Sequence, residues 1–223
     1  MHAKKAGRIK NYLSYLYPLL QEKIHSPLNG TLEIFLFKGR YQLVTEKAMY
    51  SFEDLYSSYG KALSSLHLKN IHNILVLGLG LGSIPQILQK KVNHPMHITC
   101  VEFDPVIVQL AQKYYPDIQQ WETLNIELTD ALQYVMQCTK YFDLITVDLF
   151  IDTNVPISFS GLPFLEKLKS LVSQNGIILY SRMKENYTSE KILWDNLAKV
   201  FPEKTEIETE GNSIMYWRRN FNA

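Results

Sequence analysis

Three glycines alternate with leucines where an apolar run ends, in the segment Gly78-Leu79-Gly80-Leu81-Gly82. Glycine permits a tight turn and lets a ligand come close to backbone N–H groups. A helix that starts directly after the turn would add unpaired donors and a partial positive charge. Gly78, Gly80 and Gly82 are therefore candidates for binding a nucleotide, with a purely structural turn as the alternative.

The spacing of these glycines also bears on the kind of nucleotide. Residues 78–83 read G-x-G-x-G-S, whereas the dinucleotide fingerprint is the longer G-x-G-x-x-G. This spacing favours an adenosyl amino acid over a cofactor that carries a pyrophosphate. The sequence contains no G-x-x-x-x-G-K-[ST], so a P-loop is excluded.

Three acidic residues each follow a strand-like run: Glu102, Asp130 and Asp148. In open α/β sheets, ligands bind outside the carboxyl ends of the strands. Glu102 comes about twenty residues after the glycines, where a carboxylate accepts hydrogen bonds from ribose hydroxyls. Asp130 could accept a hydrogen bond from an adenine amino group, and Asp148 could bind or deprotonate an amine.

Each of these acids also has a structural alternative. Glu102 could cap the next helix, although Asp104, directly before a proline, is better placed to do so. Asp130 could cap the helix that follows it, and this role is compatible with binding. Asp148 could simply anchor a loop.

The loop after Asp148, residues 149–161, would lie at the carboxyl end of a central strand, where a lid over a substrate belongs. Phe150 and Asp152 are its candidate substrate contacts. The other apolar residues of the loop predict an acceptor with an apolar or aromatic part. The alternative is that they close the edge of the core.

Strand-like and helix-like runs alternate from residue 73 onward. Strands are expected at 74–79, 97–102, 125–128, 142–149, 176–182, 206–209 and 213–218, with helices at 83–91, 105–115, 131–137, 161–173 and 189–200. This alternation predicts an α/β, Rossmann-like fold with a mostly parallel seven-stranded sheet and an antiparallel C-terminal hairpin. Residues 71–223 would form the nucleotide-binding domain.

Residues 1–70 are expected to form a smaller N-terminal part. Apolar residues from Ile9 to Leu20 recur at helical spacing and predict one amphipathic helix, which ends near residues 23–30. Two runs at 31–37 and 41–45, joined around Gly39, predict a small β-hairpin. A second helical stripe extends from Phe52 to Leu66.

The overall composition limits the partners of this chain. Lys and Arg number 23 and Asp and Glu 22, which gives a net charge of +1. This balance indicates neither a nucleic acid nor a membrane as partner. Cys100 and Cys138 form no disulfide framework, which favours a cytoplasmic setting. No metal site is expected, because His94 and His97 have no third ligand nearby.

With these motifs in view, the chain resembles the class I methyltransferase superfamily, and within it most closely the spermidine synthase family of aminopropyltransferases. Residues 74–83 are similar to that family's V-L-I-I-G-G-G-D-G-G and 99–108 to its V-x-x-V-E-I-D-x-x-V-I. Residues 129–134 are similar to G-D-G-F-E-Y and 141–148 to Y-D-V-I-I-x-D. The resemblance covers residues 31–182 and implies a class I methyltransferase fold, with S-adenosylmethionine or its decarboxylated form as cofactor.

The resemblance also implies roles for single residues. Glu102 would bind the ribose, Asp130 the adenine, and Asp148 would stand in the place of the catalytic acid. Relatives of this kind commonly pair through their N-terminal regions. The apolar stripe that starts at Ile9 therefore favours a homodimer, with packing on its own domain as the alternative.

Several acids of the resembled family are missing from this chain. Its glycine-rich turn has Leu81 in place of Asp, and Ala48-Met49 replace an Asp-Glu pair. The family's tyrosine in the same segment is replaced by Phe52. The family's D-S-S-D has two residues between its acids, whereas three residues separate Asp148 from Asp152 in this chain. Because polyamines are cations that need several carboxylates, spermidine synthesis is not expected.

Three functions remain as hypotheses from the sequence. The leading one is a spermidine-synthase-like transferase that uses S-adenosylmethionine, a methyltransferase acting on an unknown small molecule. The second is an aminopropyltransferase that uses decarboxylated S-adenosylmethionine. The third is a non-catalytic relative that binds a nucleotide or a partner.

Overall fold

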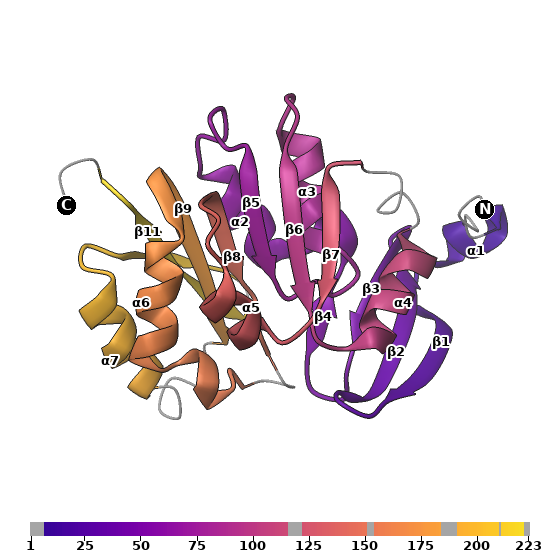
Figure 1. Ribbon diagram of the computed structural model, residues 1–223. Helices are drawn as coiled ribbons and strands as arrows, with labels where there is room; N and C mark the ends of the chain where they lie inside the picture. Colours follow the sequence, from indigo (N-terminus) through magenta and orange to yellow (C-terminus); the bar gives the residue numbers. More distant parts are fainter. Residues whose placement is uncertain (1–6, 116–121, 151–153, 184–190, 210, 221–223) are drawn as a thin grey trace.

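The computed structural model of this protein describes residues 7–115, 122–150, 154–183, 191–209 and 211–220. Its two β-sheets lie next to each other, the smaller one near the carboxyl ends of strands of the larger one (Figure 1). The larger sheet has seven strands in the order β10-β11-β9-β8-β5-β6-β7. Their bounds are β5 Asn73–Leu77, β6 His97–Glu102, β7 Leu124–Leu128, β8 Phe142–Val147, β9 Val172–Met183, β10 Thr205–Glu208 and β11 Asn212–Arg218.

The pairing of these strands confirms the predicted Rossmann-like fold. Strands β5 to β9 are parallel, whereas β11 pairs antiparallel with both β9 and β10. Strand β5 lies between β6 and β8 because the chain first adds strands on one side of β5 and then on the other. The crevice at such a reversal point is where open α/β sheets bind ligands.

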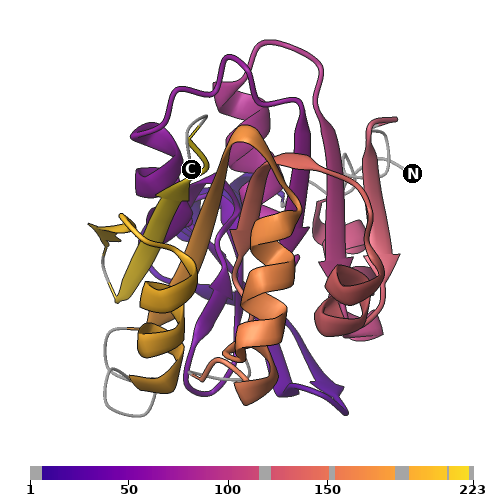
Figure 2. The ribbon, with the colours of Figure 1, turned by 60° about the vertical axis from the view of Figure 1, so that its left-hand side comes forward.

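Both faces of the central strands are covered, because residues of β5 alternate between two cores. Leu75 and Leu77 belong to one core, and Ile74 and Val76 belong to the other. The first core is covered by α5 Ala131–Gln137, α6 Leu162–Ser170 and α7 Lys191–Val200 (Figure 2). The second is covered by α2 Ser57–Ser64, α3 Ser83–Lys91 and α4 Pro105–Tyr114. None of the described helices is long and apolar enough to cross a membrane.

The N-terminal region forms a four-stranded antiparallel sheet of β1 Leu19–Ser26, β2 Gly30–Phe37, β3 Arg40–Val44 and β4 Met49–Ser51. The predicted hairpin is confirmed as β2 and β3, which are joined by Lys38 and Gly39. Both residues have positive φ angles, of 50° and 71°, as a tight hairpin turn requires. The sheet is larger than expected because β1 and β4 extend the hairpin on either side.

The predicted long N-terminal helix is wrong beyond its first turns. Helix α1 spans only Arg8–Leu13, and residues 19–26 form strand β1 instead. Pro18 cannot donate a backbone hydrogen bond and disfavours helical geometry in the residue before it. Pairing of β1 with β2 then decides the conformation, so a long-range contact overrides the local helical spacing.

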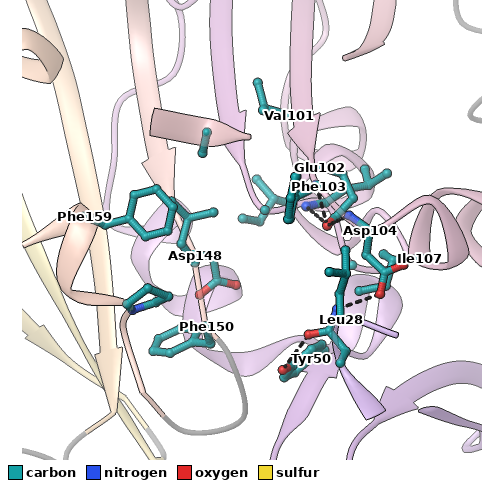
Figure 3. Close-up of a pocket in the computed structure, with 18 of the residues that line it drawn as sticks. Leu28, Tyr50, Val101, Glu102, Phe103, Asp104, Ile107, Asp148, Phe150 and Phe159 are labelled. Carbon is teal, nitrogen blue, oxygen red and sulfur yellow. Dashed lines mark hydrogen bonds between the residues drawn. The ribbon is translucent and has the colours of Figure 1, made fainter. Parts of the chain in front are cut away.

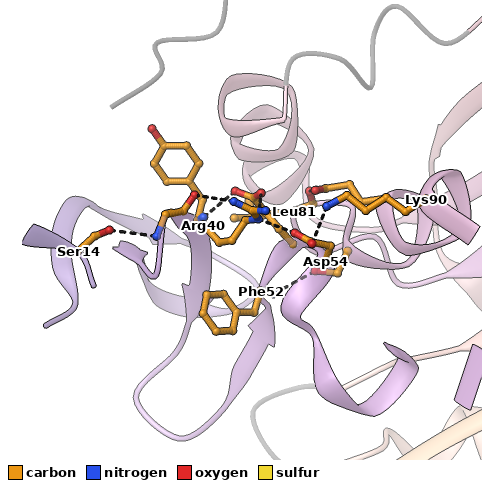
Figure 4. A network of polar contacts seen from close by, with 11 residues as sticks. Ser14, Arg40, Phe52, Asp54, Leu81 and Lys90 are labelled. Atoms are coloured by element: carbon orange, nitrogen blue, oxygen red, sulfur yellow. Dashed lines mark hydrogen bonds and ion pairs between the residues drawn. The ribbon is translucent and has the colours of Figure 1, made fainter. Parts of the chain in front are cut away.

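The two sheets are joined by an apolar contact and by polar links. Leu81, Ile107 and Leu110 pack against the four-stranded sheet in a separate core with Leu32, Ile34 and Leu43. Asp54, in the short 3-10 helix Glu53–Leu55, accepts hydrogen bonds from Arg40 Nε of β3 and from Lys90 Nζ of α3, each at 2.5 Å (Figure 4). The small sheet is therefore held in place beside the carboxyl edge of the large one.

Candidate functional site

A cavity of about 300 Å³ lies at the carboxyl edge of β5, β6 and β8, where the four-stranded sheet meets the larger one (Figure 3). The structure brings most of the residues singled out from the sequence to its walls. These are Gly78, Gly80, Glu102, Asp130, Asp148 and Phe150. Gly82 is absent from the described lining, and Asp152 lies outside the described residues, so their roles in binding stay predictions.

The first two glycines allow close approaches of backbone segments. A Cβ on Gly78, whose φ is 93°, would lie 2.3 Å from the carbonyl oxygen of Asp148. A Cβ on Gly80 would lie 2.9 Å from Cβ of Ser51 in β4. Gly82 has a left-handed φ of 82° and immediately precedes α3. The turn therefore needs glycine to bring together the ends of β5, β8 and β4.

Backbone N–H groups of this turn are largely used within the protein. Four of the five N–H groups in residues 78–82 have acceptors at 2.9 to 3.1 Å. The acceptors are Val101 O, Glu102 Oε2, Ser51 Oγ and Leu79 O. A pyrophosphate would need such donors free, so the geometry agrees with the preference for a nucleoside without one.

Glu102, at the end of β6, is fixed by the main chain. Its Oε2 accepts from Leu79 N at 3.1 Å, and Oε1 accepts from Phe103 N at 2.8 Å and Asp104 N at 3.0 Å. Burial raises the pKa of the Glu102 carboxyl, and the three amides oppose that rise. The carboxylate keeps a fixed orientation and spare acceptor capacity, as binding of a ribose hydroxyl requires.

Asp104 caps α4, as predicted, by accepting from Val106 N at 2.8 Å. The sequence did not indicate its second role. Its Oδ2 accepts from the Ser26 hydroxyl and from Asn29 Nδ2, the latter at 2.7 Å, and Asn29 also accepts from the Tyr50 hydroxyl at 3.2 Å. The turn between β1 and β2 is thereby held against one wall of the cavity.

Asp130 has the structural role that the sequence offered as an alternative. Its Oδ1 accepts from Gln133 N at 3.0 Å, which caps α5. Asp130 also lines the cavity, with Thr129 and Ala131 on either side. Capping is confirmed, and contact with an adenine stays a prediction.

Asp148 lies across the cavity from Glu102, at the end of β8 (Figure 3). Its Oδ2 accepts from the Tyr56 hydroxyl at 3.0 Å. Burial raises the pKa of Asp148 from its ordinary 3.8 to about 6, and the hydroxyls of Tyr56 and Ser181 oppose the shift only in part. A carboxyl with this pKa is ionised at neutral pH but still takes up a proton readily.

Sequence reasoning missed Tyr56 as a site residue, because it lies within an apolar stripe at helical spacing. A tyrosine in such a stripe carries a hydroxyl that must find a partner once buried, and this signal could have identified it. Tyr56 is 5% exposed and lines the cavity.

The side of the cavity next to Asp148 is mainly apolar. Leu149, Phe150, Pro156 and Phe159 line it, and the carbonyl of Phe159 accepts from the buried Tyr180 hydroxyl at 3.0 Å. The described lining includes four carboxylates, from Glu102, Asp104, Asp130 and Asp148, and no Lys or Arg side chain. Cationic ligands therefore fit this cavity better than anionic ones.

The positions at which this chain departs from the resembled family lie in different environments. Leu81 is 1% exposed and lies in the core between the two sheets rather than in the cavity. Ala48 is buried, Met49 lines the cavity, and Phe52 stacks on Phe37 with ring centroids 6.0 Å apart. The described residues contain no cluster of three potential metal ligands.

Comparisons with known proteins agree with this geometry. The family model of the spermine/spermidine synthase domain matches residues 53–209. A Drosophila melanogaster protein described as an eEF1A lysine and N-terminal methyltransferase homolog is 27% identical over 155 residues, 65% of this chain and 23% of that protein. A polyamine aminopropyltransferase from Vibrio vulnificus is 30% identical over 147 residues, 64% of this chain and 48% of that protein.

A solved structure of spermidine synthase, in complex with the transition state analogue AdoDATO, has the same fold. Its TM-score is 0.71 at 16% sequence identity, over 90% of this chain and 74% of the other. The chain thus spans less than half the length of the two curated relatives but most of the length of this structure.

Proposed function

The chain belongs to the spermine/spermidine synthase family, and from this premise we propose that it is a methyltransferase that uses S-adenosylmethionine. One observation carries the choice of methyl over aminopropyl transfer. At the positions of polyamine-binding acids, this chain has a core leucine, Leu81, and a cavity-lining methionine, Met49. Because Leu81 lies outside the cavity and Met49 is uncharged, neither position offers a polyamine a charge-assisted contact. The similarity to a methyltransferase homolog in Drosophila melanogaster supports the same choice.

The cavity suits an adenosyl cofactor in three respects. Glu102 is oriented to accept from ribose hydroxyls, and the exposed ring of Phe103 beside it offers an apolar surface to a base. The cavity is acidic, which suits a sulfonium cation. When bound, S-adenosylmethionine supplies a methyl group on that sulfonium.

We assign proton transfer to Asp148. The acceptor is a small molecule with a nucleophilic nitrogen or oxygen, held between Asp148 and the apolar wall that includes Phe150. Asp148 binds the acceptor's X–H group and receives its proton as the bond from X to the methyl carbon forms, while the bond between that carbon and sulfur breaks and S-adenosylhomocysteine leaves. Alignment of the reacting atoms supplies the rest of the rate enhancement. The residues that close the cavity, including Phe159, exclude water from the reacting atoms.

Aminopropyl transfer is the second candidate, and a different observation favours it. The described lining offers no Lys or Arg to pair with the carboxylate of S-adenosylmethionine, and decarboxylated S-adenosylmethionine lacks that group. The 30% identity with the Vibrio vulnificus aminopropyltransferase points the same way. A non-catalytic binding protein is the third candidate.

Thermal shift measurements with a panel of adenosyl ligands test these candidates. The panel contains S-adenosylmethionine, S-adenosylhomocysteine and decarboxylated S-adenosylmethionine. We expect the carboxylated ligands to raise the melting temperature more at equal concentration, because bound ligand stabilises the folded state. A preference for the decarboxylated ligand would promote aminopropyl transfer, and the absence of any shift would contradict adenosyl binding. Incubation of the protein with putrescine and decarboxylated S-adenosylmethionine should give no measurable spermidine by chromatography.

We further propose the division into an N-terminal part, residues 1–70, and a nucleotide-binding domain, residues 71–223. We also propose a cytoplasmic setting, supported by two buried free cysteines, and a homodimer. The dimer is supported by a patch of exposed apolar side chains. Its members are Ile9, Tyr12, Tyr15, Leu16, Tyr17 and Leu20, all more than half exposed.

Light scattering tests the dimer on the full chain and on a chain that starts at Pro18, which keeps strand β1 and its contact with Asp104. We expect a dimer for the first and a monomer for the second. The full-length variant Leu16→Ser, with Leu28→Ser as a control outside the patch, should weaken the dimer selectively. A monomeric full chain would refute the homodimer.

A further inference from the structure

Two tyrosines of one short segment reach the end of β8. Tyr56, directly before α2, donates to Asp148 Oδ2 at 3.0 Å, and Tyr59 in α2 donates to the carbonyl of Val147 at 2.8 Å. Their rings are stacked, with centroids 6.2 Å apart and planes 23° from parallel. The same segment thus supplies one hydroxyl to the backbone and one to the carboxylate.

Tyr56 is held as a neutral donor. Burial and the adjacent Asp148 raise its pKa well above the ordinary 10.0. Its backbone is fixed between the 3-10 helix Glu53–Leu55 and α2, with ψ at 93°. Asp54 of that 3-10 helix is tied to Arg40 and Lys90 (Figure 4), so the hydroxyl approaches the carboxylate from a rigid support.

The two oxygens of Asp148 have different surroundings. Within the described residues, Oδ1 has no hydrogen-bond partner and is closed off from solvent. Oδ2 instead accepts from Tyr56, and Asp148 lines the cavity. The terminal torsion of an aspartate side chain is broad and nearly two-fold, so an unassisted carboxylate would sample several orientations.

We propose that Tyr56 is a positioning residue for proton transfer, which holds Asp148 with Oδ2 toward the acceptor through its hydroxyl. This inference rests on the proposed function, in which Asp148 receives the acceptor's proton. The acceptor uses the second lone-pair direction of Oδ2, since the first is occupied by Tyr56. Tyr56 acts through Asp148 and needs no contact with the acceptor.

The hydroxyl also keeps the carboxylate ionised. Among the described residues, the hydroxyls of Tyr56 and of Ser181 in β9 act on the Asp148 carboxyl, and Tyr59 lies close enough to feel its charge. None of them is a cation, so a hydroxyl is the strongest available stabiliser of the negative charge. Because Tyr56 donates to the ionised form, its removal should raise the pKa of Asp148 further.

The test compares Tyr56→Phe with Tyr59→Phe, which removes a buried hydroxyl of the same segment without touching the carboxylate. In protein labelled with ¹³C at aspartate carboxyl carbons, the Asp148 resonance is identified by its loss in Asp148→Asn. We expect a midpoint near pH 6 in the unmodified protein. It should lie about 1 unit higher in Tyr56→Phe and be unchanged in Tyr59→Phe. An unchanged midpoint in Tyr56→Phe, or an equal rise in both variants, would overturn the proposal.

This titration uses the protein without ligands, so it is readable whether or not the ligand panel supports a transferase. The effect of Tyr56→Phe on kcat and on the pH profile is measured next, with a methyl acceptor on which the unmodified protein turns over. Tyr56→Phe should lower kcat about 10-fold or more and move the rising limb of the pH profile upward, with little change in the KM for S-adenosylmethionine. An unaltered kcat and pH profile would contradict the positioning role even if the titration shifts.

Discussion

The two halves of the cavity are built by different means. The half to which we assign the nucleotide, from the glycine-rich turn to Glu102, is held by backbone hydrogen bonds and by glycines that permit close approach. The half to which we assign the acceptor, around Asp148, is held by side chains from distant parts of the chain, such as Tyr56 and Phe159. Backbone geometry tolerates few changes in sequence, whereas side-chain walls can be replaced. The half that depends on the backbone keeps its glycines and Glu102, although its turn has Leu81 where the resembled family has Asp, and Met49, which also replaces an acid, lines the cavity.

The largest loss of stability is expected when an acid of the resembled family is restored at a position that this structure buries in a core. Leu81→Asp places a carboxylate in the apolar core between the two sheets. We expect a loss of about 3–5 kcal/mol in the free energy of unfolding, measured by urea denaturation, because that charge has no partner there.

Met49→Glu is the matched control, since Met49 lines the cavity and the new carboxylate can reach water. It should cost less than about 1 kcal/mol. An equal loss in the free energy of unfolding for the two variants would contradict the placement of Leu81 in a core and of Met49 in the cavity.

The contact between the two halves is tested by Gly78→Ala. The new methyl group would overlap the carbonyl of Asp148, and φ at 93° is unfavourable for alanine. We expect a loss of about 2–4 kcal/mol in the free energy of unfolding. Gly211→Ala, at a φ of 79° with open space around it, is the control and should cost about 1 kcal/mol. A similar loss in the free energy of unfolding for both variants would show that contact with Asp148 does not add to the cost at Gly78.

The nucleotide half is tested alone by Glu102→Ala. Hydrogen bonds from ribose to a charged acceptor contribute about 1.5–3 kcal/mol each, so affinity for S-adenosylhomocysteine should fall about 10²-fold or more. Titration calorimetry measures the change, with Glu127→Ala of β7 as a control that leaves the cavity lining intact. Unchanged affinity would remove Glu102 from the nucleotide site.

The smallest effect, and one of opposite sign, is expected for Asp148→Asn. The folded-state pKa of Asp148, about 6, lies above its ordinary 3.8. The carboxyl therefore contributes stability that is fully present below about pH 4 and is lost as pH rises through about 6. Asparagine keeps the size and an acceptor for Tyr56 without the charge.

Asp148→Asn should accordingly be more stable than the unmodified protein at pH 7.5, by about 1–2 kcal/mol, with the difference vanishing near pH 4. Thermal melts across this pH range measure it. Affinity for S-adenosylhomocysteine should change little, because Asp148 faces the acceptor. A variant that melts lower at pH 7.5 and loses binding would show that Asp148 only anchors its loop.

The sequence by itself determined the larger sheet and placed the glycine-rich turn and Glu102 at one edge of it. Strand–helix alternation predicted β5 to β11, and the run that ends at Gly78 placed the turn, because the signals for these elements are local. Glu102 and Asp148 could be assigned to one edge of the sheet because parallel strands all end at the same edge. The cap at Asp104 was likewise readable from the proline that follows it.

Only the tertiary structure decided the N-terminal sheet and the acceptor half. The helical spacing of apolar residues from Ile9 to Leu20 predicted a helix that continues past residue 19, yet residues 19–26 form β1 because hydrogen bonds to β2 outweigh that local preference. Leu81 and Met49 read as equivalent losses of acid in the sequence, but one lies in a core and the other in the cavity. The bond between Tyr56 and Asp148 joins residues 92 positions apart. No local pattern encodes such a contact, because it exists only when α2 packs on the sheet whose strand carries the carboxylate.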